Sequence, residues 1–290
     1  MSSAAEVLHR LMVGDTQIEF SERGTGEPVL LVHAGVFADW FVPVASVHEL
    51  ETFRVIRMRR AGYVSGAAPA HHLTMADHAR HVSALMDALG IATAHLCGHS
   101  SSCLINLQLA MERPERVATL VLMDPAPGAV LQAPSQEHFT NSVARPALAA
   151  AAESTESAFD IWMAGVARDY RAIVESALGP DGYRGAVAQS RFFFADELPA
   201  IREWALDRDR AARLTQPVLL IRGGDSPPNF HHMVELLAGV LPHVETATAG
   251  GVGHLMPLQD PEGVARLIAE FARRHPITST DDARARSATR

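Results

Sequence analysis

The sequence predicts an α/β fold with a doubly wound, mostly parallel sheet and one helical insertion, on three observations. Short, continuously apolar segments typical of strands buried on both faces recur along the chain. Segments with helical hydrophobic periodicity separate them. Over residues 127–213 this alternation stops, and an alanine-rich helical segment takes its place. With 290 residues, 48% of them apolar and 20% charged, the chain can bury one large core and still carry an insertion.

The predicted elements of the core follow in order. Residues 18–23 alternate like a half-buried strand and lead into a turn at 24–28. Residues 29–33 are continuously apolar up to a final histidine and begin the parallel sheet. Further buried strands are predicted at 53–58, 94–97, 117–123 and 218–221, with helices at 75–89 and 104–111. Strands and helices that alternate in this way form a doubly wound sheet through right-handed crossovers.

We therefore divide the chain into a first core part (1–126), a helical lid (127–213), a second core part (214–275) and a flexible tail (276–290). Helices are expected in the lid at 158–169 and 195–209. After the strand at 218–221, the second core part should contain a helix near 230–241, a short strand at 244–248 and a helix at 261–274. Asp260 is expected to cap this last helix, and Pro261 suits its first turn.

Charge and composition exclude several classes of protein. The formal net charge of −8 argues against nucleic acid as a partner and favours a small-molecule substrate. Cys97 and Cys103 have neither the number nor the spacing of a zinc site or a disulfide framework. No signal peptide or apolar span is visible, so we expect a cytoplasmic protein without membrane contact, either a monomer or a homodimer. No cofactor and no metal are expected.

The segment Gly98-His99-Ser100-Ser101-Ser102 lies between a buried strand and an amphipathic helix. This is the setting in which the pattern G-x-S-x-G presents a serine nucleophile on a tight strand-to-helix turn. Ser102 stands in place of the second glycine, and it is still small. A turn at a helix N-terminus also directs free backbone N–H groups toward a developing oxyanion. Taken alone, Ser100 could be an ordinary N-cap serine, but its setting favours a nucleophile.

On these residues the chain resembles the α/β-hydrolase fold family, in the branch with a serine nucleophile. The resemblance extends from about residue 18 to residue 274. It is carried by the turn at Ser100, by the segments 107–110, 113–117 and 120–124, and by Gly253-His254. These motifs are specific to the fold and not to a substrate.

The resemblance implies a base and an oxyanion hole. His254, in a glycine-rich loop after the last predicted strand, comes last in the order serine, acid, histidine, and would take the proton of Ser100. The segment His33-Ala34-Gly35-Val36 follows the first long strand, where the family has His-Gly-x. The N–H of Gly35, with Val36 as the next candidate, and the N–H of Ser101 would bind the oxyanion. His33 is expected to bond loop backbone.

Two aspartates compete for the role of the acid. Asp225 follows the strand after the lid, but counting three residues from Gly223 reaches Ser226, so Asp225 lies one residue early. Asp124 ends the strand after the nucleophile, where some members of the family carry their acid. Loop capping by Asp124 and an Asx turn at Asp225 are the structural alternatives. The sequence leaves both aspartates open.

Two clusters of charged or titratable residues allow more than one interpretation. Four histidines, two of them on the helix at 75–89, could suggest a metal site, but we expect an ordinary amphipathic helix with these side chains outward: His71, His72, His78 and His81. Three arginines are explained either as an ion-paired cluster or as a group that steers an anionic substrate: Arg57, Arg59 and Arg60.

Three aromatic residues are candidates for substrate binding between core and lid: Trp40, Phe41 and Trp162. The phenylalanines at 192–194 could contribute as well. Aromatic side chains at such positions also serve as plain core.

The function predicted from these residues is a serine hydrolase that cleaves an ester, thioester or related acyl bond through a Ser-His-Asp triad and an acyl-enzyme. The alternative is a non-hydrolytic enzyme of the same fold, such as a lyase, a cofactor-free oxygenase or a cyclase of natural-product metabolism, in which Ser100 and His254 transfer protons. A binding module without catalysis is a third possibility, which an intact triad disfavours.

Overall fold

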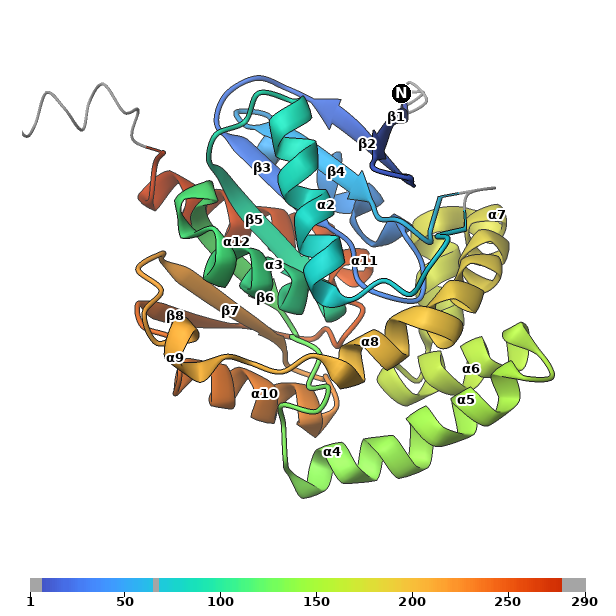
Figure 1. Cartoon of the computed structure of the whole chain (residues 1–290). Coiled ribbons are helices and arrows are strands. Elements are labelled where there is room, and N and C mark those ends of the chain that lie inside the picture. Colours follow the sequence, from blue (N-terminus) through green and yellow to red (C-terminus); the bar gives the residue numbers. More distant parts are fainter. Residues whose placement is uncertain (1–6, 65–67, 278–290) are drawn as a thin grey trace, which may run out of the picture.

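One eight-stranded sheet runs through the centre of the molecule in this computed structural model, which describes residues 7–64 and 68–277 (Figure 1). The predicted tail lies mostly outside the described residues. The strands are β1 (His9–Val13), β2 (Thr16–Arg23), β3 (Pro28–Val32), β4 (Arg54–Arg59), β5 (Ala94–His99), β6 (Val117–Met123), β7 (Val218–Gly223) and β8 (Val244–Ala249).

The strand order is β1-β2-β4-β3-β5-β6-β7-β8. Strands β1 and β2 pair antiparallel with each other, and β2 pairs antiparallel with β4; all other pairs are parallel. The predicted doubly wound, mostly parallel sheet is confirmed. The carboxyl ends of β3, β5, β6 and β7 meet at one edge of the sheet, which is where open α/β sheets place their sites.

Helices cover both faces of the sheet. On one face α2 (Met75–Ala88) packs against α3 (Ser101–Glu112); on the other, α1 (Val42–Ala45), α11 (Met256–Gln259) and α12 (Pro261–Arg274) lie together (Figure 1). Helix α10 (Pro228–Ala238) packs on β7. Asp260 caps α12, as predicted, by accepting a hydrogen bond from the N–H of Gly263 at 2.9 Å.

Between β6 and β7 the chain is helical, and we call residues 134–211 the helical insertion. It comprises α4 (Pro134–Phe139), the π-helical turn η4 (Thr140–Ala144), α5 (Arg145–Ala151), α6 (Thr155–Val166), α7 (Tyr170–Phe192), the π-helical turn η5 (Phe193–Glu197), α8 (Leu198–Glu203) and α9 (Arg208–Ala211). It lies beside the carboxyl edge of the sheet (Figure 1).

Two local predictions differ from the structure. Strand β1 was not predicted, because it is an edge strand whose side chains are mostly exposed and lack a buried stripe. The single helix predicted at 195–209 breaks at Trp204, which is extended at φ −68° and ψ 131°. The buried Trp204 indole donates a hydrogen bond to Gln108 Oε1 at 2.8 Å, so a tertiary contact overrides the local helical preference.

The expectation that the histidines of α2 point outward is wrong for His78 and His81, which are 0% and 6% exposed. His78 lies on the same inward stripe as Met75 and Val82, so helix geometry buries it whatever its polarity. Burial lowers the pKa of His78 well below its ordinary value, and the neutral ring behaves as a core group.

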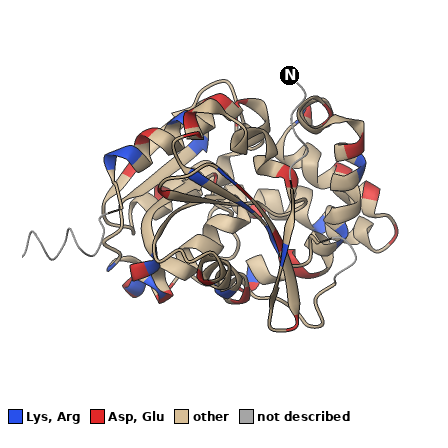
Figure 2. Ribbon diagram, turned by 90° about the horizontal axis from the view of Figure 1, so that it is seen from above, with Lys and Arg blue, Asp and Glu red and all other residues tan. Residues whose placement is uncertain are grey.

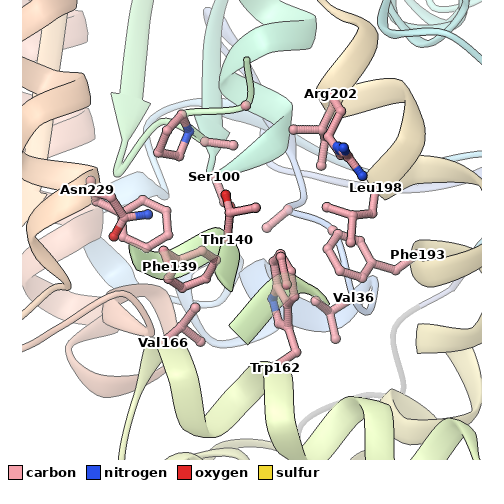
Figure 3. A pocket seen from close by; sticks show the side chains of 18 of the residues that line it. Val36, Ser100, Phe139, Thr140, Trp162, Val166, Phe193, Leu198, Arg202 and Asn229 are labelled. Carbon is pink, nitrogen blue, oxygen red and sulfur yellow. The ribbon is translucent and has the colours of Figure 1, made fainter. Parts of the chain in front are cut away.

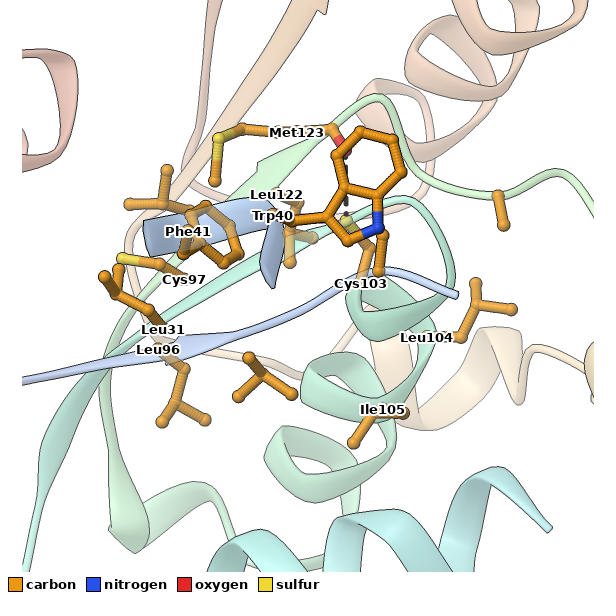
Figure 4. Packing of buried hydrophobic residues seen from close by; sticks show 14 of the residues in the cluster. Leu31, Trp40, Phe41, Leu96, Cys97, Cys103, Leu104, Ile105, Leu122 and Met123 are labelled. Atoms are coloured by element: carbon orange, nitrogen blue, oxygen red, sulfur yellow. Dashed lines mark hydrogen bonds between the residues drawn. The ribbon is translucent and has the colours of Figure 1, made fainter. Parts of the chain in front are cut away.

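The core beneath the predicted nucleophile turn is apolar (Figure 4). Cys97 and Cys103 are buried free thiols there, and burial raises the pKa of both. Phe41, proposed as a pocket residue, is fully buried and belongs to this core.

Charged residues of both signs are interspersed over the molecule (Figure 2). The three arginines that could have steered an anion are ion-paired: Arg57 and Arg59 with Asp39 at 3.4 and 2.8 Å, and Arg60 with Glu197 at 2.8 Å. The ion-paired explanation of this cluster is therefore correct. Within 7–64 and 68–277, none of the helices combines the length and apolarity needed to cross a bilayer.

Candidate active site

Ser100 lies between β5 and α3 in a strained backbone conformation, with φ 54° and ψ −118°. Positive φ is costly for a residue with a side chain and persists where the surroundings enforce it. Hydrogen bonds enforce it here: the N–H of Ser100 donates to the Met123 carbonyl at 2.9 Å, and its carbonyl accepts from Ala126 N at 3.1 Å. The turn is thereby fixed to the end of β6, and Ser100 borders a cavity.

The residues on either side explain why the turn can be so tight. A Cβ at Gly98 would lie 2.8 Å from Asn106 Nδ2 and 3.0 Å from Cys103 N, so only glycine fits. Ser102, the departure from the motif, is fully buried; its hydroxyl accepts from His99 N at 2.8 Å and donates to the Val32 carbonyl at 2.6 Å. The hydroxyl of Ser102 thus ties the turn to the neighbouring strand β3.

Asp124 and His254 are brought together at the carboxyl ends of the strands. His254 Nδ1 lies 3.2 Å from Asp124 Oδ2, and the side chains are 5% and 0% exposed. Asp124 also accepts hydrogen bonds from Gly223 N at 3.1 Å and from Ser226 Oγ at 2.5 Å. Three donors to one buried carboxylate fix its orientation toward the imidazole.

Asp225, the competing candidate for the acid, is exposed, while its backbone N–H bonds the Val252 carbonyl at 3.0 Å. The structure does not bring its side chain to His254. The residue that the count from Gly223 reaches, Ser226, is the one that bonds Asp124. Between the two aspartates left open by the sequence, the geometry favours Asp124.

The His254 ring is held from two further sides. Phe230 stacks on it with ring centroids 4.0 Å apart and an interplanar angle of 21°, and His99 lies 4.7 Å away. His99 Nε2 donates to the His254 carbonyl at 2.8 Å. Burial and the nearby His254 lower the pKa of His99 well below its usual value, so His99 is a neutral donor.

The predicted oxyanion donors lie around Ser100. Gly35 and Val36 border the same cavity, and Ser101 is the first residue of α3, where backbone N–H groups have no intrahelical acceptor. Val36 has φ 75°, and its backbone interacts with the Tyr63 hydroxyl, which favours Gly35 over Val36 as the candidate donor. His33 bonds backbone as predicted: Nδ1 donates to the Ala34 carbonyl at 2.6 Å, and Nε2 accepts from Arg60 N at 3.0 Å.

Backbone strain is concentrated at this site. Four non-glycine residues among those the structure describes have positive φ, and three of them are Val36, Ser100 and Asp124. Strain of this kind gathers where function fixes geometry.

The cavity has a volume of about 320 Å³ and lies between the sheet edge and the helical insertion (Figure 3). Its wall contains Ser100, His254 and Trp40, and the insertion contributes Trp162 and Phe193. Of the three aromatic candidates for substrate binding, Trp40 and Trp162 line the cavity and Phe41 does not. Apolar walls with a few polar groups are typical of small-molecule sites.

Several residues near this cavity were not identified from the sequence. Phe230, Ser226 and Glu197 reach the site through tertiary packing, and no local motif marks them. Over the described part of the chain, no group of three or more His, Cys, Asp or Glu side chains could hold a metal ion.

Comparisons with known proteins match this architecture. The sequence profile described as alpha/beta hydrolase fold matches residues 27–261. A carboxylesterase of Bacillus subtilis, YbfK, is 26% identical over 271 residues, which cover 89% of this chain and 84% of that protein. A 2-hydroxy-6-oxo-6-phenylhexa-2,4-dienoate hydrolase of Comamonas testosteroni is 33% identical over 119 residues, covering 39% of this chain and only 41% of that enzyme.

Among solved structures, the enol-lactonase of Burkholderia xenovorans LB400 superposes with a TM-score of 0.74 at 20% identity, over 91% of this chain and all of that one. At this identity the likeness concerns the fold. The match over residues 27–261 shows that the chain belongs to the alpha/beta hydrolase fold family.

Proposed function

We propose that this protein is a serine hydrolase that cleaves an ester or related acyl bond of a small molecule, with Ser100 as nucleophile, His254 as base and Asp124 as acid. The observation that carries the proposal is the buried contact between His254 Nδ1 and Asp124 Oδ2 beside a strained serine on the wall of one cavity.

The chemistry follows from these positions. His254 Nε2 takes the proton of the Ser100 hydroxyl as its oxygen attacks the acyl carbon, and the N–H groups of Gly35 and Ser101 bind the oxyanion. His254 then gives the proton to the departing alcohol, leaving an acyl-enzyme. Water attacks this ester with His254 again as base, and the acid product leaves with Ser100 restored. Asp124 holds the imidazole in the required tautomer throughout.

The cavity wall narrows the substrate class. It is mainly apolar, with Trp162, Phe193 and Val166 opposite Ser100, which suits an acyl group of moderate size (Figure 3). Two arginines of the insertion, Arg145 and Arg202, also border the cavity, and neither has an ion-pair partner among the described residues. We extend the proposal to substrates that carry a carboxylate away from the scissile bond.

The test is hydrolysis of p-nitrophenyl acyl esters of graded length by the wild type and by Ser100→Ala. The proposal predicts turnover that depends on Ser100 and has an optimum at short to medium acyl length. Absence of turnover on the whole series, or equal turnover by Ser100→Ala, would contradict it.

A further inference from the structure

A fully buried carboxylate from the helical insertion lies against the nucleophile turn. Glu197, in the turn η5, is 0% exposed. Its Oε1 accepts hydrogen bonds from the Ser101 hydroxyl at 2.6 Å and from Arg60 Nη2 at 2.8 Å, and its Oε2 accepts from the Tyr63 hydroxyl. Ser101, Arg60 and Tyr63 all belong to the core, so this carboxylate joins the insertion to the core.

Arg60 and Tyr63 connect Glu197 to the other side of the oxyanion hole. Arg60 Nη2 also donates to the Ala34 carbonyl at 3.0 Å, and Arg60 Nε donates to the His33 carbonyl at 3.1 Å. Tyr63 interacts with the backbone of Val36. Burial and the adjacent Glu197 raise the pKa of Tyr63, which therefore stays a neutral donor. One network thus holds both Ser101 and the loop of residues 33–36.

The same face of the insertion touches that loop directly. A Cβ at Gly35 would lie 2.6 Å from the Phe193 ring and 3.2 Å from Glu197 Oε1. One turn earlier, Gln189 Oε1 accepts a hydrogen bond from Ala38 N at 2.8 Å. Gln189, Phe193 and Glu197 are spaced by four residues and so lie on one side of the helix. Phe193 and Val36 lie beside each other in the cavity wall (Figure 3).

The position of Glu197 separates it from the reacting groups. It does not border the cavity, so it cannot touch the substrate. A buried ion pair is a weak source of stability, because desolvation offsets its attraction, and it is often better explained by the geometry it specifies. Glu197 lies in a π-helical turn, and such turns are frequent at functional sites.

We propose that Glu197 is a positioning residue that fixes the two oxyanion donors, Gly35 and Ser101, relative to Ser100, so that the helical insertion completes the oxyanion hole. This inference rests on the proposed function. Loss of an oxyanion donor lowers kcat about 10²- to 10³-fold, and a displacement of ~1 Å has an effect of about 10². Displacing the donors acts on the transition state and leaves ground-state binding almost unchanged.

The test compares three variants. Glu197→Ala removes the acceptor; Ser101→Ala removes one donor to Glu197 but keeps the backbone N–H at position 101; Glu197→Gln keeps the shape and can still accept from Ser101. The matched control is Glu203→Ala, because Glu203 lies one helix further on, is exposed and, among the residues that the structure describes, bonds only His72. Each variant is assayed for kcat and KM on the best ester and for the Ki of an alkylboronic acid, whose adduct with Ser100 places an oxygen in the hole.

We expect Glu197→Ala to lower kcat about 10- to 100-fold and to raise the boronate Ki by a similar factor, with KM changed less than about threefold. Ser101→Ala should lower kcat in the same way. Glu197→Gln should have a kcat at least about tenfold higher than that of Glu197→Ala, and Glu203→Ala should match the wild type. An active wild type whose kcat and boronate Ki are unchanged in Glu197→Ala, or in Ser101→Ala if Glu197→Ala does not fold, overturns this inference alone. A wild type that hydrolyses no ester overturns the proposed function instead.

Discussion

Replacing Asp124 by asparagine should lower kcat about 10⁴-fold, and the hydrogen bonds of the carboxylate show why. Oδ1 faces the Gly223 N–H, which can only donate, so the single amide oxygen of asparagine must remain there. The NH₂ group then faces Ser226 and His254 Nδ1. It stabilises the imidazole tautomer with its proton on Nε2, which cannot accept the proton of Ser100.

A 10⁴-fold loss corresponds to about 5.5 kcal/mol of transition-state stabilisation, at ~1.4 kcal/mol for each factor of ten. The assay is kcat on the best ester at pH 7, with the thermal midpoint measured beside it to confirm folding. Asp225→Asn is the matched control and should retain activity within about twofold, because its side chain is exposed. Near-normal turnover by Asp124→Asn, or a large loss in Asp225→Asn, would refute the assignment.

Two further outcomes are expected. Burial holds the pKa of three histidines well below the ordinary value of about 6.5. Well above pH 6.5 these histidines are neutral in both the folded and the unfolded chain, so they do not make the free energy of unfolding depend on pH. Below about pH 6.5 the unfolded chain binds protons that the folded chain does not, so the free energy of unfolding falls as pH falls, by at most ~1.4 kcal/mol per pH unit for each of His33, His78 and His99. Urea unfolding measured from pH 7 to pH 5 should show that the free energy of unfolding falls less steeply with falling pH in His78→Leu than in the wild type. An equal pH dependence in the two proteins would count against the buried neutral ring. Arg202→Gln should raise KM about fivefold, or ~1 kcal/mol, for an ester with a terminal carboxylate and leave KM for a neutral ester of equal length unaltered; equal effects on both esters would remove Arg202 from substrate binding.

Much of the fold was predictable because the signals are local. The strand at 117–123 and the helix at 261–274 match β6 and α12 in the structure, since each is bounded by clear changes in hydrophobic pattern. The edge strand β1 and the helix break at Trp204 could not be predicted in this way. The exposed side chains of β1 and the hydrogen bond from Trp204 to Gln108 leave no trace in the local hydrophobic periodicity.

The candidate site also combines residues that local sequence signals indicate with residues that only tertiary packing identifies. The sequence indicates Ser100 and His254 as candidates by their positions next to strand ends and glycines, but it does not rank Asp124 against Asp225, because both follow a strand. Only the spatial neighbourhood separates them: Asp124 is 0% exposed beside His254, and Asp225 faces solvent. Glu197 is 96 residues from Ser101 in sequence, and its contact with Ser101 depends entirely on how the insertion packs.

The direct test of Ser100 as nucleophile is covalent capture. The wild type is treated with a fluorophosphonate, digested, and mapped by mass spectrometry, with Ser100→Ala and His254→Ala in parallel. A phosphonyl adduct is expected on Ser100, absent in Ser100→Ala and formed at least about 10²-fold more slowly in His254→Ala. No adduct on the wild type, or equal labelling of Ser100→Ala, would contradict the assignment of Ser100 as the nucleophile.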